Sequence, residues 1–99
     1  MLQIERKQNG STLEIALTGR LDTVTAPQLE AEFKAGMDGV NEVVIDCAAL
    51  EYVSSAGLRV LLAAYKQMAA LGGMKLRAVC EDVMEVFEIT GFADIFTIE

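Results

Sequence analysis

The spacing of the hydrophobic residues switches repeatedly along this chain between a period of two, typical of strands, and a spacing of three or four, typical of helices. Residues 2–8 and 12–19 are β-like, and the Asn9-Gly10 pair between them can adopt the positive φ angles that a tight hairpin needs. In residues 12–19, hydrophobic residues alternate with polar or small ones. One face of that strand is therefore expected to be exposed to solvent or covered only by small groups. The chain is therefore expected to open with a β-hairpin.

A helical stripe follows the hairpin and leads to a β-branched run. Residues 25–28 predict the start of a helix, with the threonine as its cap and a proline in its first turn, and the hydrophobic stripe continues to Met37. The run 43–45, which ends at Asp46, indicates a central strand that is covered on both faces or nearly so. Residues 47–53 are expected to form the loop after it.

The second half of the chain repeats the alternation of helix and strand. From Leu58 the hydrophobic residues recur every three or four positions until the glycine pair 72–73, which predicts a helix of about four turns. Residues 74–80 alternate as in another strand. Asp82 is then expected to cap a shorter helix that ends at Gly91.

Together these elements predict a small α/β domain. Residues 94–98 can add a final edge strand, which gives a mixed β-sheet of four to five strands packed with three or four helices. A chain of 99 residues can bury one hydrophobic core but has no room for a second, so residues 1–99 are expected to form a single domain.

The composition and the charge exclude several classes of protein. A hydrophobic content of 53% with a single proline does not fit disorder, and no apolar run approaches the roughly 20 residues of a membrane-spanning helix. The first residues lack the features of a secretory signal, so a cytoplasmic protein without membrane insertion is expected. A net charge of minus 7 disfavours direct binding to nucleic acid or anionic lipid, and a partner with a basic surface fits better.

The two cysteines do not indicate a metal site. Cys47 and Cys80 each end an apolar run, where a thiol usually behaves as a small buried hydrophobic group, and both are expected to be reduced core residues. A structural zinc site needs four soft or nitrogen ligands, and the chain has no histidine. No metal and no cofactor are expected.

The segment YVSSAGLRVLL, residues 52–62, places two serines and a glycine where a loop gives way to a helix. One serine can serve as the N-cap. Capping explains neither the second serine nor Gly57, because glycine in a first turn weakens a helix by up to roughly 1 kcal/mol. The glycine indicates that another group approaches closely, and the helix start also tolerates negative charge, including a phosphate carried by a serine.

Enzymatic activity is not indicated. A serine at a strand-to-helix turn resembles a hydrolase nucleophile superficially, but the chain has no histidine to activate it and lacks the G-x-S-x-G pattern. The glycine pairs at 36–39 and 72–73 lack the following Lys-Ser or Lys-Thr of a phosphate-binding loop. We expect no catalytic residues.

The run 46–58 resembles the signature of STAS domains, a family named for sulfate transporters and anti-sigma factor antagonists. Residues 19–22 look like the first corner of that family, residues 65–73 like its long helix and residues 86–92 like its last helix. The resemblance covers nearly the whole chain, and it implies a STAS fold.

Resemblance to the free-standing members implies an anti-sigma factor antagonist. In that family the unmodified protein binds an anti-sigma factor that is also a serine kinase, which frees the sigma factor, and phosphorylation of one serine ends the binding. The phosphorylated position falls on Ser55, with Ser54 as the second choice. A phosphatase is a further candidate partner, and the protein is expected to be a monomer or a weak homodimer.

The expected docking surface surrounds this serine. A phosphate brings about minus 1.5 to minus 2 charges, and a like charge about 4 Å away costs about 4 kcal/mol at an effective dielectric near 20. The surface is expected to comprise Asp22, Thr23, Ser54, Ser55, Gly57 and Arg59. Asp22 equally fits a turn or cap residue before the first helix, and Arg59 a solvated helix residue.

A second function stays open at this point. The family often has an aspartate where Ser54 stands and a serine or threonine where Ala56 stands. A chain that departs from the pattern in this way also fits a STAS adaptor subunit that is not phosphorylated and that belongs to a transporter complex or a signalling scaffold.

Overall fold

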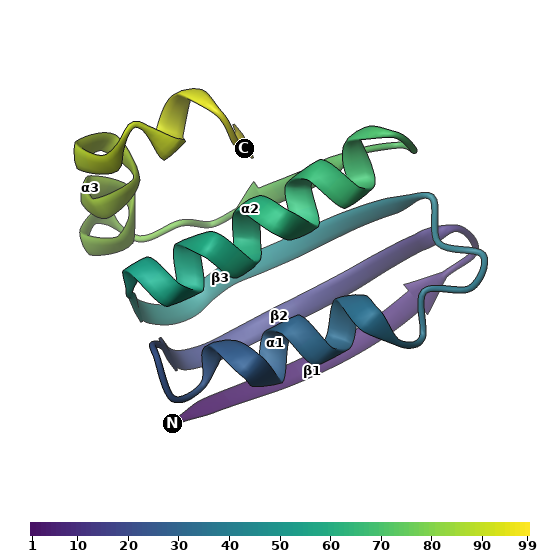
Figure 1. Cartoon of the computed structure of the whole chain (residues 1–99), viewed down its shortest axis with the longest axis horizontal. Coiled ribbons are helices and arrows are strands. Elements are labelled where there is room, and N and C mark those ends of the chain that lie inside the picture. The colour runs from purple at the N-terminus through teal and green to yellow at the C-terminus, as the bar shows by residue number, and fades with distance from the viewer.

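Five strands form one mixed sheet in the computed structural model, which describes residues 1–99 (Figure 1). The strands lie in the sheet in the order of the sequence, and only the first pair is antiparallel. They are β1 (Leu2–Asn9), β2 (Thr12–Leu21), β3 (Glu42–Val53), β4 (Met74–Arg77) and β5 (Thr97–Ile98). The helices are α1 (Ala26–Lys34), α2 (Ser55–Ala69), α3 (Glu81–Thr90) and a short 3-10 helix, η1 (Phe92–Asp94). The expected α/β architecture is confirmed.

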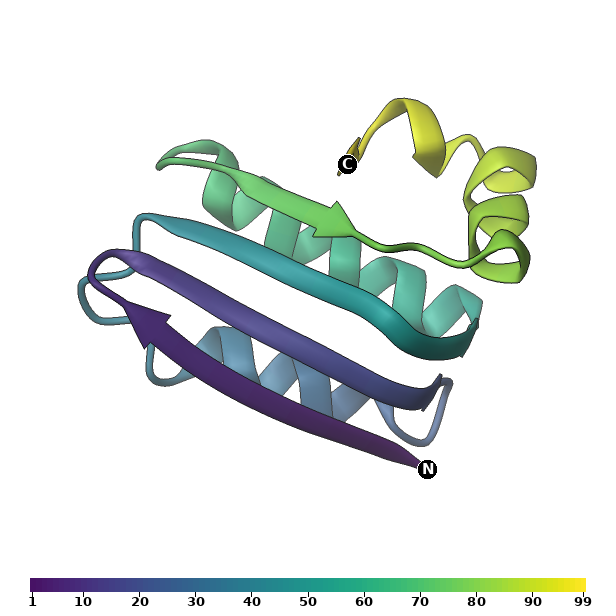
Figure 2. The same ribbon diagram turned by 180° about the vertical axis from the view of Figure 1, so that it is seen from behind.

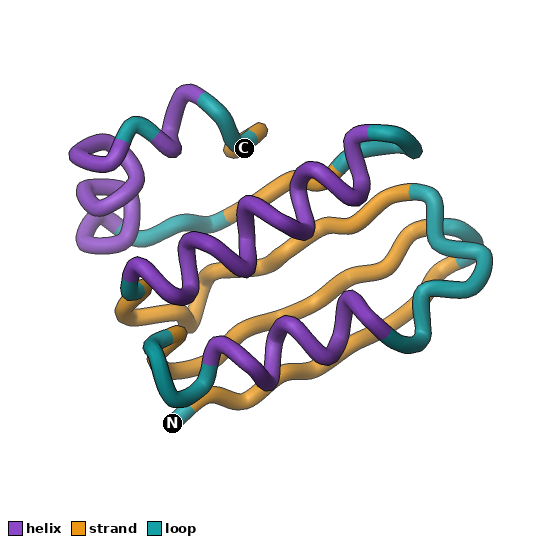
Figure 3. Tube along the Cα trace, in the orientation of Figure 1, coloured by secondary structure: helices purple, strands orange, loops and turns teal.

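The two longer connections place their helices on the same face of the sheet. Figure 1 shows α1 and α2 in front of the strands, and Figure 2, from behind, shows the strands in front of both helices. Because the parallel strands are added in one direction and crossovers are right-handed, successive crossovers return to the same side. The third helix lies beside the sheet, beyond the end of β4 (Figure 3). The opposite face of the sheet therefore has no helix on it.

This one-sided cover corrects the expectation for the β-branched run in β3. Val43 and Ile45 are fully buried under the helices, but Val44 between them is only half-buried, on the open face. On that face Asp46 of β3 and Glu14 of β2 both form ion pairs with the Arg77 guanidinium. The run is β-branched because it is a strand, and not because both its faces are covered.

The strand β3 is also longer than expected, because residues 47–53 continue it instead of forming a loop. The pairing of β2 with β3 shifts register twice, between Ala16 and Thr18 and between Gly19 and Arg20. These irregularities break the period of two, so the residues that are buried after Ile45 recur every third position, at Cys47, Leu50 and Val53. Because of this extension, β3 ends beside the last residue of β2, where Val53 pairs with Leu21.

One helix start confirms its expectation and another corrects it. The helix α2 begins at Ser55 with Ser54 as its N-cap, as expected for one of the two serines. Cys80, and not Asp82, occupies the N-cap of α3, so Asp82 lies inside the first turn, where its charge still faces the positive end of the helix. Strand β4 ends at Arg77, and Ala78 follows with a φ of 57°.

The two cysteines are both free but differ in exposure. Cys47 is fully buried, and burial raises the pKa of its thiol to about 12, so the thiol stays neutral. Cys80 is only partly buried, and its Sγ lies 3.4 Å from the Leu50 carbonyl oxygen. The expectation of a core residue is thus confirmed for Cys47 and is only partly right for Cys80.

Candidate functional site at the start of α2

The boundary between β3 and α2 falls between the two adjacent serines. Ser54 has extended backbone angles and is the N-cap of α2, and its Oγ accepts a hydrogen bond from the Gly57 amide at 3.3 Å. Ser55 is the first residue of the helix, and its side chain is exposed. One hydroxyl is therefore committed to the backbone, whereas that of Ser55 is directed to solvent.

The close approach that the glycine indicates is present. Gly57 is buried, and a Cβ atom at this position would lie 2.7 Å from Cγ and 3.0 Å from the carbonyl oxygen of Leu21, the last residue of β2. The same Leu21 carbonyl accepts a hydrogen bond from the Ser54 amide at 2.9 Å. The first turn of α2 is thus pressed onto the end of β2, and Gly57 lies beneath the surface that the serines form.

Asp22 organises the turn between β2 and α1. Its Oδ1 accepts hydrogen bonds from the amides of Val24 and Thr25, both at 3.0 Å. The Thr25 hydroxyl accepts from the Asp22 amide and donates to the Arg20 carbonyl, both at 2.8 Å, and does not cap α1 as expected. The hydrogen bond from the Thr25 amide is the largest cause that lowers the pKa of Asp22. These hydrogen bonds support the interpretation of Asp22 as a turn residue before the first helix.

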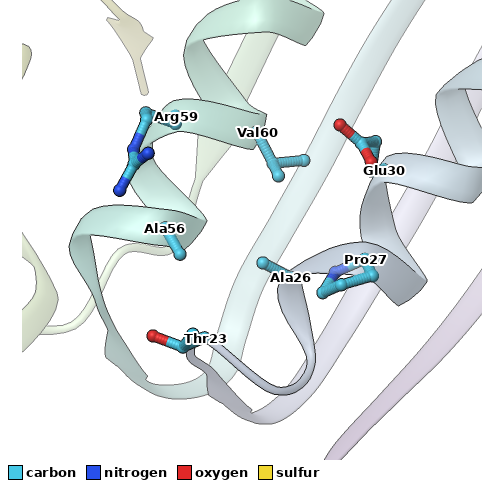
Figure 4. A pocket seen from close by; sticks show the side chains of 7 residues that line it. All are labelled: Thr23, Ala26, Pro27, Glu30, Ala56, Arg59 and Val60. Carbon is cyan, nitrogen blue, oxygen red and sulfur yellow. The ribbon is translucent and has the colours of Figure 1, made fainter.

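A shallow hollow of about 290 Å³ lies between the first turns of α1 and α2 (Figure 4). Small side chains from both helices, Ala26 and Ala56, face it, and Thr23 lies at its end. Its two charged lining residues come from opposite helices, Glu30 from α1 and Arg59 from α2. The hollow can accept a small apolar group from a partner while a polar group meets its rim.

The structure brings the predicted docking residues to one end of the molecule, at the carboxyl ends of β2 and β3, except that Gly57 is buried beneath this surface and is not part of it. Asp22 and Thr23 come from the turn after β2, while Ser54, Ser55 and Arg59 come from the cap and first turns of α2. The hydrogen bonds and contacts to Leu21 join the two groups.

Sequence reasoning missed the contribution of the first helix. Pro27 and Glu30 of α1 line the hollow with Val60 of α2, a juxtaposition that only the packing of the two helices creates. It also missed Val24, whose side chain is 84% exposed in the turn beside Thr23. A hydrophobic residue in a polar turn was the available signal, because such a residue gains nothing for the fold there.

Comparison with known proteins decides the family. A family model described as the STAS domain matches residues 3–99. The chain belongs to the STAS domain family.

Two relatives of this STAS domain are named as anti-sigma factor antagonists. The candidate anti-sigma factor antagonist BtrV of Bordetella bronchiseptica is 45% identical over 86 residues, which are 83% of this chain and 72% of BtrV. The anti-sigma-B factor antagonist of Bacillus subtilis is 28% identical over 98 residues, which are 98% of this chain and 90% of that protein.

A solved structure has the same fold. The crystal structure of an anti-sigma factor antagonist from Mycobacterium paratuberculosis matches this STAS domain with a TM-score of 0.88 at 26% identity. The match covers 99% of this chain and 85% of the other. None of the helices described above is long and apolar enough to cross a membrane.

Proposed function

We propose that this STAS domain is a cytoplasmic anti-sigma factor antagonist that serine phosphorylation switches off. In the unmodified state it binds an anti-sigma factor that is also a serine kinase, through the end of the molecule where Ser55 lies, and the sigma factor is released. The observation that carries the proposal is the exposed Ser55 hydroxyl beside the hollow between α1 and α2. The relatives named as anti-sigma factor antagonists support it.

The chemistry of the switch is a phosphoryl transfer that the partner performs. The γ-phosphoryl group of ATP is transferred to Oγ of Ser55, the bond to the leaving ADP breaks, and the hydroxyl proton goes to a base of the kinase. Ser55 is a better acceptor than Ser54, because the Ser54 hydroxyl is bonded to the Gly57 amide and the residue is half-buried. A phosphatase that hydrolyses the phosphate ester resets the switch.

Charge accounts for most of the proposed loss of binding. The phosphate adds about minus 1.5 to minus 2 charges, and one like charge about 4 Å away across the interface costs about 4 kcal/mol at an effective dielectric near 20. This corresponds to roughly a thousandfold in affinity. Loss of a neutral hydrogen bond from the hydroxyl would cost only about 1 kcal/mol.

The test combines mapping of the phosphate with binding of two variants. Incubation with the cognate kinase and ATP is expected to add one phosphate, which mass spectrometry of peptides places on Ser55. By calorimetry, Ser55→Ala is expected to bind the anti-sigma factor as the unmodified protein does, and Ser55→Asp at least tenfold more weakly, since it adds a negative charge.

Ser11 offers a matched control, because it is exposed in the hairpin turn. Ser11→Asp adds the same charge and is expected to leave binding unchanged. Equal affinities of the two Ser55 variants would contradict the charge mechanism. A protein that binds its partner but gains no phosphate from an active kinase would instead be the adaptor subunit of a transporter complex or signalling scaffold.

A further inference from the structure

Arg59 is a cation without an acidic partner at the rim of the hollow. Of the eight Lys and Arg side chains, four form ion pairs with carboxylates: Arg6, Lys34, Lys75 and Arg77. Arg59 is exposed and is not among them, and α2 contains neither aspartate nor glutamate. Across the hollow, the Glu30 carboxylate lies 3.6 Å from the Lys34 ammonium group of its own helix. The Arg59 charge is thus available.

The position of Arg59 relative to Ser55 is fixed by the helix. The two residues are four apart in α2, a spacing that places their Cβ atoms about 5 to 6 Å apart on one face. Long side chains in a helix point back toward its N-terminus, and Figure 4 shows the Arg59 side chain running along α2 toward the first turn. A guanidinium at that place can reach a phosphate on Ser55, and its planar fork matches phosphate oxygens.

We propose that Arg59 changes partner when Ser55 is phosphorylated. In the unmodified protein its guanidinium pairs with a carboxylate on the anti-sigma factor, and in the modified protein it pairs with the phosphate on Ser55 of its own chain. Phosphorylation then removes a cation from the docking surface in addition to placing an anion there. This proposal rests on the proposed function, because it needs both the partner and the phosphate.

The change in local charge shows why the exchange matters. The Ser55 and Arg59 pair carries a charge of plus one before modification and about minus 0.5 to minus 1 after it. A partner carboxylate that meets Arg59 is attracted in the first state and repelled in the second. Phosphorylation of one serine would thus reverse the sign of the interaction at one place in the interface.

The phosphate contact can be tested without the kinase. Three proteins that carry phosphoserine at position 55 are titrated by phosphorus NMR. They are the otherwise unchanged domain, Arg59→Gln and Lys66→Gln. Lys66 is the matched control, since it is exposed on α2 and lies eleven residues from Ser55. With Arg59 present, the second phosphate pKa is expected to be lower by about 0.2 to 0.4 than in Arg59→Gln, and about 1 M salt should remove the difference. Equal pKa values in the two proteins would overturn the proposal.

The partner contact is tested by calorimetry on the unmodified protein with the anti-sigma factor and no ATP. Arg59→Gln is expected to weaken binding by roughly tenfold, and Lys66→Gln by less than about twofold. An unchanged affinity of Arg59→Gln would also overturn the proposal. If the wild-type domain does not bind an anti-sigma factor at all, the proposed function fails, and the NMR comparison still decides the phosphate contact. If binding is lost on phosphorylation but the NMR comparison shows no difference, the function stands and the exchange by Arg59 is wrong.

Discussion

The two serines at the start of α2 differ because the helix boundary falls between them. The Ser54 hydroxyl accepts a bond from the Gly57 amide, and that of Ser55 is exposed. From the sequence, either serine could be the cap. The choice depends on where β3 ends, which the double shift in register determines and which no local pattern reports.

The contact between Gly57 and Leu21 predicts the effect of a single methyl group. Gly57→Ala is expected to destabilise the protein by about 1 to 3 kcal/mol, although alanine favours a helix, because its Cβ would lie 2.7 Å from Leu21 Cγ. Unfolding in urea measures the change. In a Leu21→Ala background the same substitution should cost less, since the clashing side-chain atoms are absent. An identical cost in both backgrounds would contradict this explanation.

The hydrogen bonds to Asp22 predict a pH dependence of stability. Because they lower the pKa of Asp22 in the folded protein, the stabilisation is fully present above the unfolded aspartate pKa of about 4 and is lost as the pH falls below it. Asp22→Ala should therefore be less stable than the wild type at pH 7, and the difference should shrink toward pH 3. Urea unfolding at the two pH values measures this. Asp38→Ala, at an exposed loop position, should show no such difference.

At the scale of elements, the order of strands and helices followed from hydrophobic spacing, and their ends often did not. The stripe of α2 begins at Leu58, but three residues before it belong to the helix and carry the candidate site. The last strand, β5, falls within the predicted range 94–98. Residues near an element end contact caps and neighbouring strands more than the core, so their sequence carries little periodic information.

The turn between β2 and α1 predicts an effect on partner binding. Val24 is 84% exposed and follows Thr23, which lines the hollow, so Val24→Asp is expected to weaken binding of the anti-sigma factor by at least tenfold without loss of stability. Calorimetry and a thermal melt measure the two quantities. Ile89→Asp is the matched control, because Ile89 is 77% exposed on α3. Equal effects of the two variants would show that the turn has no special part in binding.

At the scale of the whole molecule, the mixed sheet and its one-sided helices place the ends of β2 and β3 together with the start of α2 (Figure 1). The sequence predicted that Asp22 and Ser55 would lie near each other only through the family resemblance. The hollow could not be predicted from the sequence, because packing between α1 and α2, and not any spacing in the sequence, places Glu30 and Arg59 in its lining.

The net charge of minus 7 predicts how association with the partner depends on salt. If the anti-sigma factor presents a basic surface, its association rate should fall by roughly tenfold between about 20 and 300 mM salt, because the long-range attraction is screened. Stopped-flow fluorescence measures the rate. Glu81→Gln combined with Glu85→Gln, which removes two of the four negative charges on α3, should reduce the salt dependence. A rate that does not change with salt would count against a basic partner surface.

The attachment of α2 to Leu21 has a consequence for how quickly the protein can respond. The first turn is held against β2 by the hydrogen bond from the Ser54 amide to the Leu21 carbonyl, and the buried Gly57 lets it pack closely there. If Ser55 is phosphorylated as proposed, the phosphate would therefore be added to, and removed from, a turn that is already fixed in place. The lifetime of the phosphate would then be set by the kinase and the phosphatase, and not by a conformational change of the domain.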